Sequence, residues 1–202
     1  MTAKEHVNIL LFNKWDTSNI EINDLGLKNV ISLKPAAAFP ITFGRHEHHR
    51  LKKAEVNIVE RLANRMMHFG KKYAKNTGRM GGKKARTLNI VKTGLEIIHS
   101  QTGKNPVELL IRAVENSSPN EDTTRIVYGG VVYHVSVDVA PLRRVDLALR
   151  FIAEGVREST YSDPQTIEEA LSKEIILAAN NDMASHAVKK KNEQERIAMA
   201  SR

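Results

Sequence analysis

The sequence predicts a mainly α-helical protein: a helical bundle of about six helices, with one protruding β-hairpin and an N-terminal extension. Hydrophobic residues make up 41% of the 202 residues and aromatic residues only 5%, so the core must consist mainly of aliphatic side chains. That composition favours helices packed on helices. Most of the chain after residue 56 repeats apolar side chains at intervals of three and four residues, the spacing of an amphipathic helix. One stretch instead alternates with a period of two, which indicates strands.

The length suits one domain with extensions and is short for two domains. Residues 1–55 are expected to form the N-terminal extension, because their hydrophobicity is patchy and the segment from Pro35 to Pro40 has the composition of an extended loop. Residues 56–202 are expected to form the helical domain, which includes the hairpin at 123–139.

Helices are expected over residues 57–69 and 85–100, from 105, from 141, over 166–179, and as a short last helix over 192–201. Two of them begin with clear caps. Asn105 is a good N-cap, Pro106 follows at the first helical position, and Glu108 stands three residues after the cap. Thr166 and Glu169 have the spacing of a capping box, in which each side chain bonds to the backbone of the other.

The hairpin is predicted from the pair Gly129-Gly130, which separates two β-prone runs. A two-residue turn of this kind needs a positive φ, which glycine adopts without strain. After the turn, valines and Tyr133 alternate with polar residues up to Val139, so the second strand is expected to be half-buried. A lone hairpin cannot form a large sheet, and its tip is therefore expected to project towards a partner.

Positive charge is concentrated in two parts of the chain. The net charge is +8 and the isoelectric point about 9.7, but residues 45–92 hold fourteen Lys or Arg against three acidic residues. Residues 105–186 hold seven basic and thirteen acidic residues, and residues 187–202 hold five basic and two acidic. Solubility does not require this asymmetry, whereas a surface that docks on phosphates does.

Within the basic block, Arg61, Arg65, His68 and Lys72 form a stripe on the first helix that contains no acidic residue and leads into the basic loop 70–84. A solvated helix face is the alternative, but the adjoining loop favours contact with RNA. Arg143 and Arg144 lie in the first turn of a later helix, where the helix dipole disfavours cations. An external anion would compensate them. Intrahelical pairs with acidic residues explain the later arginines of that helix equally well.

Two other site types are weighed against RNA binding. The cluster His46, His48 and His49 could share a metal ion, but it has no further ligand pattern and a basic arm explains it better. The pair Gly82-Lys83 resembles part of a nucleotide-binding loop. Lys84 follows where Ser or Thr is needed for magnesium, so this interpretation is rejected.

The remaining function classes are disfavoured. The chain has no cysteine, which excludes thiol chemistry and disulfides, and no paired carboxylates or nucleophile–base motif predicts an enzyme or a cofactor. No segment is long enough to span a membrane, so we expect no membrane partner and a cytoplasmic location. A basic helical DNA-binding protein is the main alternative. It would concentrate its charge on one recognition helix, whereas here the charge covers a loop, an arm, two helices and a tail.

From about Phe12 to Arg202 the chain resembles the universal ribosomal protein seven family of the small subunit, known in eukaryotes as small-subunit protein five. The matching stretches are IVERLANRMM, GKKARTLNIVKTGLEIIH, NPVELLIRAVENSSPNEDTTRI, VDVAPLRRVDLALR and AVKKKNEQERIAMASR. The stretch LFNKWDTSNIEIN resembles the eukaryotic branch. Gly94 departs from the family pattern, which usually has Ser, Thr, Ala or Cys at that position.

The resemblance implies a non-enzymatic constituent of the small ribosomal subunit that binds the 3′ major domain of the rRNA and organises assembly of the head. Its partners would be small-subunit rRNA, neighbouring ribosomal proteins of the head, exit-site tRNA and mRNA, with nucleolar assembly expected. The hairpin tip Tyr128, Gly129, Gly130 and Val131 would lie near tRNA and mRNA. The expected rRNA-binding residues are Arg61, Arg65, Lys71, Lys72, Lys75, Arg79, Lys83, Lys84, Arg86, Arg143, Arg144, Lys189, Lys190 and Lys191.

Overall fold

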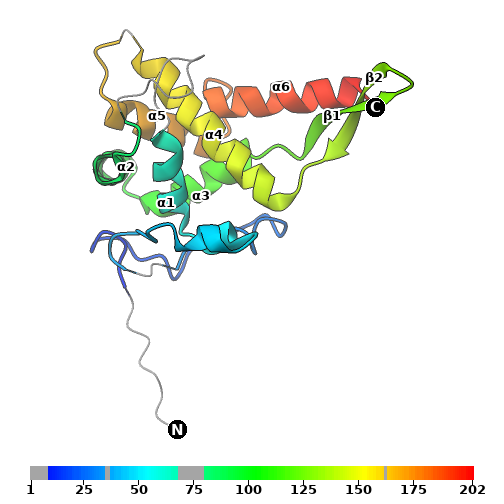
Figure 1. Ribbon diagram of the computed structural model, residues 1–202. Helices are drawn as coiled ribbons and strands as arrows, with labels where there is room; N and C mark the ends of the chain where they lie inside the picture. Colours follow the sequence, from blue (N-terminus) through cyan, green and yellow to red (C-terminus); the bar gives the residue numbers. More distant parts are fainter. Residues whose placement is uncertain (1–8, 35–36, 68–79, 162) are drawn as a thin grey trace.

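The computed structural model describes residues 9–34, 37–67, 80–161 and 163–202 (Figure 1). Within them lie six α-helices and one two-stranded antiparallel sheet, which confirms the predicted mainly α fold with a hairpin. Two short 3-10 helices precede the bundle. In chain order the elements are η1 (Arg45–His48), η2 (Lys52–Glu55), α1 (Ile58–Met66), α2 (Lys84–Thr102), α3 (Pro106–Ser117), β1 (Glu121–Tyr128), β2 (Val131–Asp138), α4 (Pro141–Thr160), α5 (Ile167–Ala179) and α6 (His186–Ala200).

Two helix starts follow the local sequence as predicted. At α3 the Asn105 side chain accepts a hydrogen bond from the Val107 N–H at 3.1 Å, and Pro106 occupies the first turn. At α5 the capping box of Thr166 and Glu169 is complete. These contacts satisfy N–H groups that the first turn of a helix cannot pair internally.

Helix α5 packs against α2, α3 and α4, and its side chains meet theirs in an aliphatic core. This packing explains why glycine occupies position 94, where the family usually has Ser, Thr, Ala or Cys. A Cβ at this position would lie 3.1 Å from Leu171 Cδ2, which is tighter than ordinary van der Waals contact. The glycine therefore lets α2 approach α5 closely, at some cost in helix propensity.

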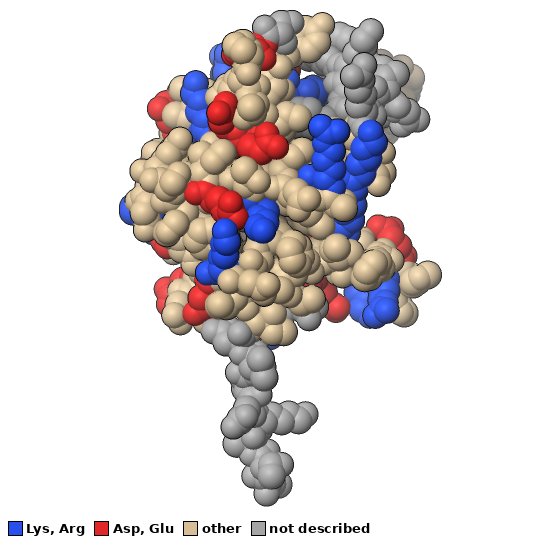
Figure 2. All heavy atoms as spheres, turned by 90° about the vertical axis from the view of Figure 1, so that its left-hand side faces the viewer, with Lys and Arg blue, Asp and Glu red and all other residues tan. Residues whose placement is uncertain are grey.

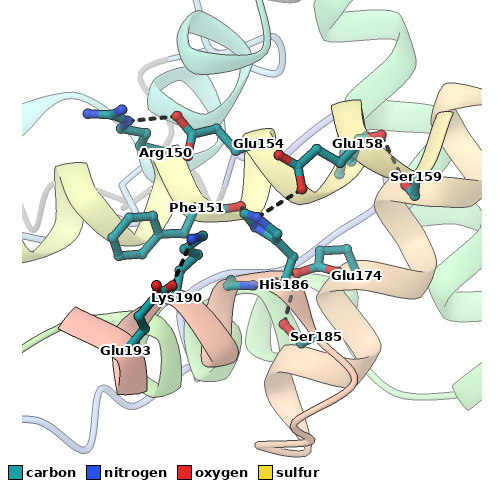
Figure 3. Close-up of polar contacts among 12 residues, drawn as sticks. Arg150, Phe151, Glu154, Glu158, Ser159, Glu174, Ser185, His186, Lys190 and Glu193 are labelled. Atoms are coloured by element: carbon teal, nitrogen blue, oxygen red, sulfur yellow. Dashed lines mark hydrogen bonds and ion pairs between the residues drawn. The ribbon is translucent and has the colours of Figure 1, made fainter. Parts of the chain in front are cut away.

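Helix α6 begins earlier than the sequence predicted, at His186 rather than near residue 192, and so it includes the three lysines of the tail. The buried carboxylate of Glu174, on the neighbouring helix α5, bonds to the start of α6 (Figure 3). Glu174 Oε1 accepts hydrogen bonds from Ser185 Oγ at 2.8 Å and from the Ala187 N–H at 2.9 Å. A carboxylate at a helix N-terminus also complements the helix dipole.

The N-terminal segment, residues 9–34 and 37–56, lies along one side of the bundle beneath α1 and α3 in Figure 1. Leu11, Phe12, Leu27 and Ile31 are buried in the same core as the helices. Although the sequence suggested an extension, these residues therefore contribute to the core of the helical domain.

The hairpin projects from the bundle beside the C-terminal end of α6 (Figure 1). Its register pairs Glu121 with Asp138 and Tyr128 with Val131 around the glycine turn. The prediction of a half-buried second strand was wrong: Val131, Tyr133, Val135 and Val137 are all exposed, and only Val139, just after the strand, is buried. Period-two alternation distinguishes two faces of a strand, but it does not show that either face is covered.

Candidate nucleic-acid interface

The start of α2 exposes basic side chains. Lys83 is the N-cap residue and makes no capping hydrogen bond through its side chain, and no acidic residue lies in the first turn. Lys83 and Arg86 are both exposed. Two cations therefore adjoin the positive end of the helix dipole, an arrangement that favours an external anion.

Lys84, the next residue after Lys83, faces the protein instead. Its ammonium pairs with the carboxylate of Glu60, which is 0% exposed, and Lys84 is itself partly buried. The same oxygen of Glu60 accepts hydrogen bonds from the N–H and the hydroxyl of Thr42, at 2.9 and 2.8 Å. Lys84 is one of the expected rRNA-binding residues, but unlike Lys83 it is not exposed, and it joins α2 to α1 and the N-terminal segment.

The two arginines at the start of α4 divide in the same way. The Arg143 side chain is 66% exposed and lies 3.4 Å from Asp122 of the hairpin. Arg144 is largely buried and donates hydrogen bonds to Asp24 at 2.7 Å and to Ser118 Oγ at 3.2 Å. The neighbouring arginines therefore serve different roles, and Arg144 fastens the N-terminal segment to the bundle.

Arg61, the first member of the predicted basic stripe, is also internal, with an exposed fraction of 2%. It donates hydrogen bonds to the Val30 carbonyl at 3.0 Å and to Asp146 Oδ1 at 3.3 Å. Burial lowers the pKa of Arg61, and the charge of Asp146 partly offsets that effect. Because Arg61, Lys84 and Arg144 are engaged within the protein, we leave all three out of the proposed RNA surface.

Asp146 of α4 is the centre of a charge cluster that the sequence did not reveal. Lys53 Nζ lies 2.9 Å from Oδ2, while Arg61 and Arg65 approach Oδ1 to 3.3 and 3.6 Å. Burial alone would raise the pKa of Asp146, but the hydrogen bond from Lys53 and the three positive charges hold it below its ordinary value. The partners come from η2 and α1, both far from α4 in the sequence, so sequence spacing gave no sign of the cluster apart from the i, i+4 arginines.

On α6, Lys189 is exposed, while Lys190 and Lys191 are partly exposed. Lys190 pairs with Glu193 at 2.7 Å on the same helix (Figure 3). The hydrogen bond with Glu193 raises the pKa of Lys190, and the same bond lowers the pKa of Glu193. Lys189 is therefore the member of the triplet most open to an external partner.

The space-filling view of Figure 2 shows long basic side chains standing together at the upper right of one face, while acidic side chains gather elsewhere on it.

Four predicted contacts in the basic loop lie outside the described residues, so the structure gives no position for them. They are Lys71, Lys72, Lys75 and Arg79.

The hairpin has the turn that the sequence predicted, with φ of 58° at Gly129 and 81° at Gly130. Its two faces differ. Ile126, Tyr133 and the tip pair Tyr128 and Val131 share one face, and all four are exposed. The opposite face includes the cross-strand pair of Arg125 and His134, and it is polar except for the exposed pair Val127 and Val132 next to the tip. The hairpin therefore offers one mainly apolar and one mainly polar face to its surroundings.

The other candidate sites can be placed as well. His46 bonds to Thr42 Oγ1 at 3.3 Å and contacts Glu47 at 3.0 Å. Among the described residues, no group of three or more His, Cys, Asp or Glu is arranged to hold a metal ion. None of the described helices combines the length and the apolar character needed to cross a membrane.

Comparison with known proteins gives a consistent result. The model of the family "Ribosomal protein S7p/S5e" matches residues 37–202. The small ribosomal subunit protein uS7 of Cenarchaeum symbiosum is 66% identical over 198 residues, which cover 98% of this chain and 99% of the relative. The uS7 protein of Methanosphaera stadtmanae is 44% identical over 191 residues, or 95% of this chain and 97% of the relative.

Both of these relatives are archaeal, and the first aligns over almost its whole length, the N-terminal segment included. The eukaryotic branch predicted from the N-terminal stretch is therefore not supported. The expectation of nucleolar assembly depended on that branch and loses its basis.

Proposed function

Since the chain belongs to the S7p/S5e family of ribosomal proteins, we propose that it is a structural, non-enzymatic constituent of the small subunit that binds the 3′ major domain of the rRNA and organises assembly of the head. The observation that carries this proposal is the set of exposed cations at the starts of α2 and α4. Lys83 and Arg86 adjoin one helix N-terminus and Arg143 the other. Helix N-termini and arginine side chains are both suited to phosphate.

The proposed RNA surface has fewer residues than the sequence suggested. It consists of Lys83, Arg86 and Arg143 with Lys189 and its neighbours on α6, together with Arg65, which is partly exposed. Lys71, Lys72, Lys75 and Arg79 of the basic loop remain predicted contacts.

Salt dependence tests the electrostatic part of the proposal. If about six phosphates are neutralised, the logarithm of the binding constant for a transcribed 3′ major domain fragment should fall with the logarithm of salt concentration at a slope of roughly −4 to −5. Nitrocellulose filter binding over a range of salt concentrations measures this slope. A nearly flat profile would contradict the proposal.

Cosedimentation tests the assignment in the cell. Tagged protein should migrate with small subunits in a sucrose gradient, and a Lys83→Glu, Arg86→Glu variant should shift to the top while its circular dichroism stays helical. Both side chains are exposed and outside the core, so the fold should tolerate the change.

For the hairpin we propose a role at the exit site, near tRNA and mRNA, with neighbouring head proteins as further partners. The support is its projection from the bundle and the exposure of its tip, together with the family resemblance. The polar face with Arg125 and His134 suits nucleic acid, whereas the apolar face suits a protein neighbour.

A further inference from the structure

A small cavity lies where the N-terminal segment, α1 and α4 meet. Its volume is about 180 Å³. A water molecule occupies roughly 30 Å³ in the liquid, so the cavity has room for a larger guest. Among its lining residues are His46, Lys53, Arg61, Asn64, Arg65 and Asp146.

The charges around this cavity do not balance. Within the part of the chain that the structure describes, Asp146 is the one carboxylate that Lys53, Arg61 and Arg65 share, at 2.9, 3.3 and 3.6 Å. Three cations therefore converge on a single negative charge. The other acidic residue of the lining, Glu47, contacts His46 and is largely exposed, so water screens its charge. The remaining positive charge lies partly inside the protein, where mutual repulsion is stronger than in water.

The donors around the cavity are also incompletely used within the described residues. Arg61 Nε is buried and has no hydrogen-bond partner there. Arg65 Nη2 lies 3.6 Å from Asp146, which is beyond an ordinary N–H···O hydrogen bond. Lys53 and Arg65 are partly exposed, so the cavity can be reached from solvent. A guest must therefore be a compact anion that accepts several hydrogen bonds.

We propose that this cavity binds one phosphate group of the rRNA backbone, with Arg65 and Lys53 as its contacts and Asp146 holding both cations in position. The inference rests on the proposed function, because RNA supplies the phosphate. The guanidinium of Arg65 matches phosphate geometry, and one added negative charge reduces the excess left by Asp146. This site adds Lys53 to the RNA surface, and it gives Arg65 a specific role.

Neutral substitutions test the two contacts. Arg65→Gln and Lys53→Gln should each reduce the magnitude of the salt slope by about one in binding to the 3′ major domain fragment. Lys52→Gln is the matched control, since Lys52 is exposed in the same short helix but does not line the cavity. The control should leave the slope unchanged.

Removing the Asp146 carboxylate should change RNA affinity in the opposite direction to the Arg65 and Lys53 substitutions. Asp146→Asn removes the negative charge from the lining but keeps an oxygen that can accept hydrogen bonds from Lys53 and Arg65, so it should tighten binding of the RNA fragment while it lowers the thermal midpoint of the free protein. A residue with a purely structural role would weaken both. Should Asp146→Asn not fold, Arg65→Lys replaces it as the test. This variant keeps the positive charge, so the salt slope should stay the same, but RNA affinity should fall because the planar guanidinium group is lost.

Inorganic phosphate provides a probe that does not depend on RNA. At equal ionic strength, phosphate should raise the thermal midpoint of the wild-type protein relative to chloride, and Arg65→Gln should abolish that rise. If RNA binding shows the expected salt slope but Arg65→Gln and Lys53→Gln behave like Lys52→Gln, the phosphate site is overturned and the proposed function stands. If the wild-type protein shows no salt-dependent RNA binding, the proposed function fails, and the phosphate shift alone then supports or overturns an anion site.

Discussion

The N-terminal segment and the hairpin both lie outside the helical bundle, yet they relate to it in opposite ways. The segment buries Leu11 and Leu27 in the core, and Arg61 and Arg144 bond to it from α1 and α4. Among the described residues, the hairpin bonds to the rest of the protein near its base, where the Asn120 N–H donates to Glu195 of α6 at 2.9 Å. Its apolar side chains stay exposed. One region completes the fold, and the other is available for partners.

This difference explains why adjacent basic residues have different roles. Successive side chains on a helix point about 100° apart, so one can face the N-terminal segment while the next faces solvent. Lys84 and Arg144 face inwards and hold the segment, whereas Lys83 and Arg143 face outwards. Positive charge in this chain therefore has two uses, and only the structure separates them.

The largest effect is expected from Arg61→Ala. This change removes a buried guanidinium together with its bonds to the Val30 carbonyl and Asp146. Breaking a buried ion pair from one side costs about 3 kcal/mol or more. Chemical denaturation should show that loss, while Arg86→Ala, an exposed control on α2, should change the unfolding free energy by less than about 0.5 kcal/mol. Equal effects from the two variants would mean that the segment does not depend on Arg61.

A smaller effect is expected when Lys84→Gln is compared with Lys83→Gln. Lys84→Gln removes the cation that pairs with the fully buried Glu60, which should destabilise the fold by about 1–3 kcal/mol. Lys83→Gln should leave stability unchanged but weaken RNA binding and reduce its salt slope by about one. The two substituted positions are adjacent, yet Lys84→Gln should change mainly stability and Lys83→Gln mainly RNA binding. A loss of RNA binding without loss of stability in Lys84→Gln would reverse the assignment.

The pH dependence of stability should report the cluster around Asp146. The pKa of this carboxyl is lower in the folded protein than its ordinary value of 3.8, so the unfolded chain binds the proton more readily. Its contribution is therefore fully present above about pH 4, and it is lost as the pH falls through the folded-state pKa. Denaturation at several pH values should show a steeper acid loss for the wild-type protein than for Asp146→Asn. Parallel profiles would mean that the carboxyl is not perturbed.

Much of the fold could be predicted from the sequence because its determinants are local. Asn105 with Pro106, and Thr166 with Glu169, fix two helix starts through residues only a few positions apart. Gly129-Gly130 fixes the hairpin turn in the same way.

The features that sequence reasoning missed depend on contacts between distant segments. Arg144 and its partner Asp24 are 120 positions apart. At the start of α6, Ser185 is a local N-cap that sequence reasoning overlooked, but the bond from the Ala187 N–H to the buried Glu174 of α5 could not be read from the tail alone. The sequence could predict where basic residues gather, but it could not predict which of them the N-terminal segment covers.

The smallest effect on stability, and the largest on function, is expected from shortening the hairpin. Removal of Val127, Tyr128, Val131 and Val132 leaves Gly129-Gly130 between Ile126 and Tyr133, which are already cross-strand partners. Because cross-strand pairs alternate between two kinds, removing two pairs restores the same kind beside the turn and keeps the register.

The shortened protein loses side chains that are already exposed, so its thermal midpoint should stay close to that of the full chain. Its affinity for the 3′ major domain fragment should also persist, since the exposed cations of α2 and α4 are untouched. What should change is exit-site behaviour, measured as frameshifting and tRNA retention by reconstituted subunits. The matched control exchanges Val127 and Val132 for threonine, which keeps both the length and the β-branched shape. Unfolding of the shortened protein would show that the hairpin supports the core, as the N-terminal segment does. If the protein instead folds, assembles and translates with unchanged fidelity, the proposed exit-site role is wrong.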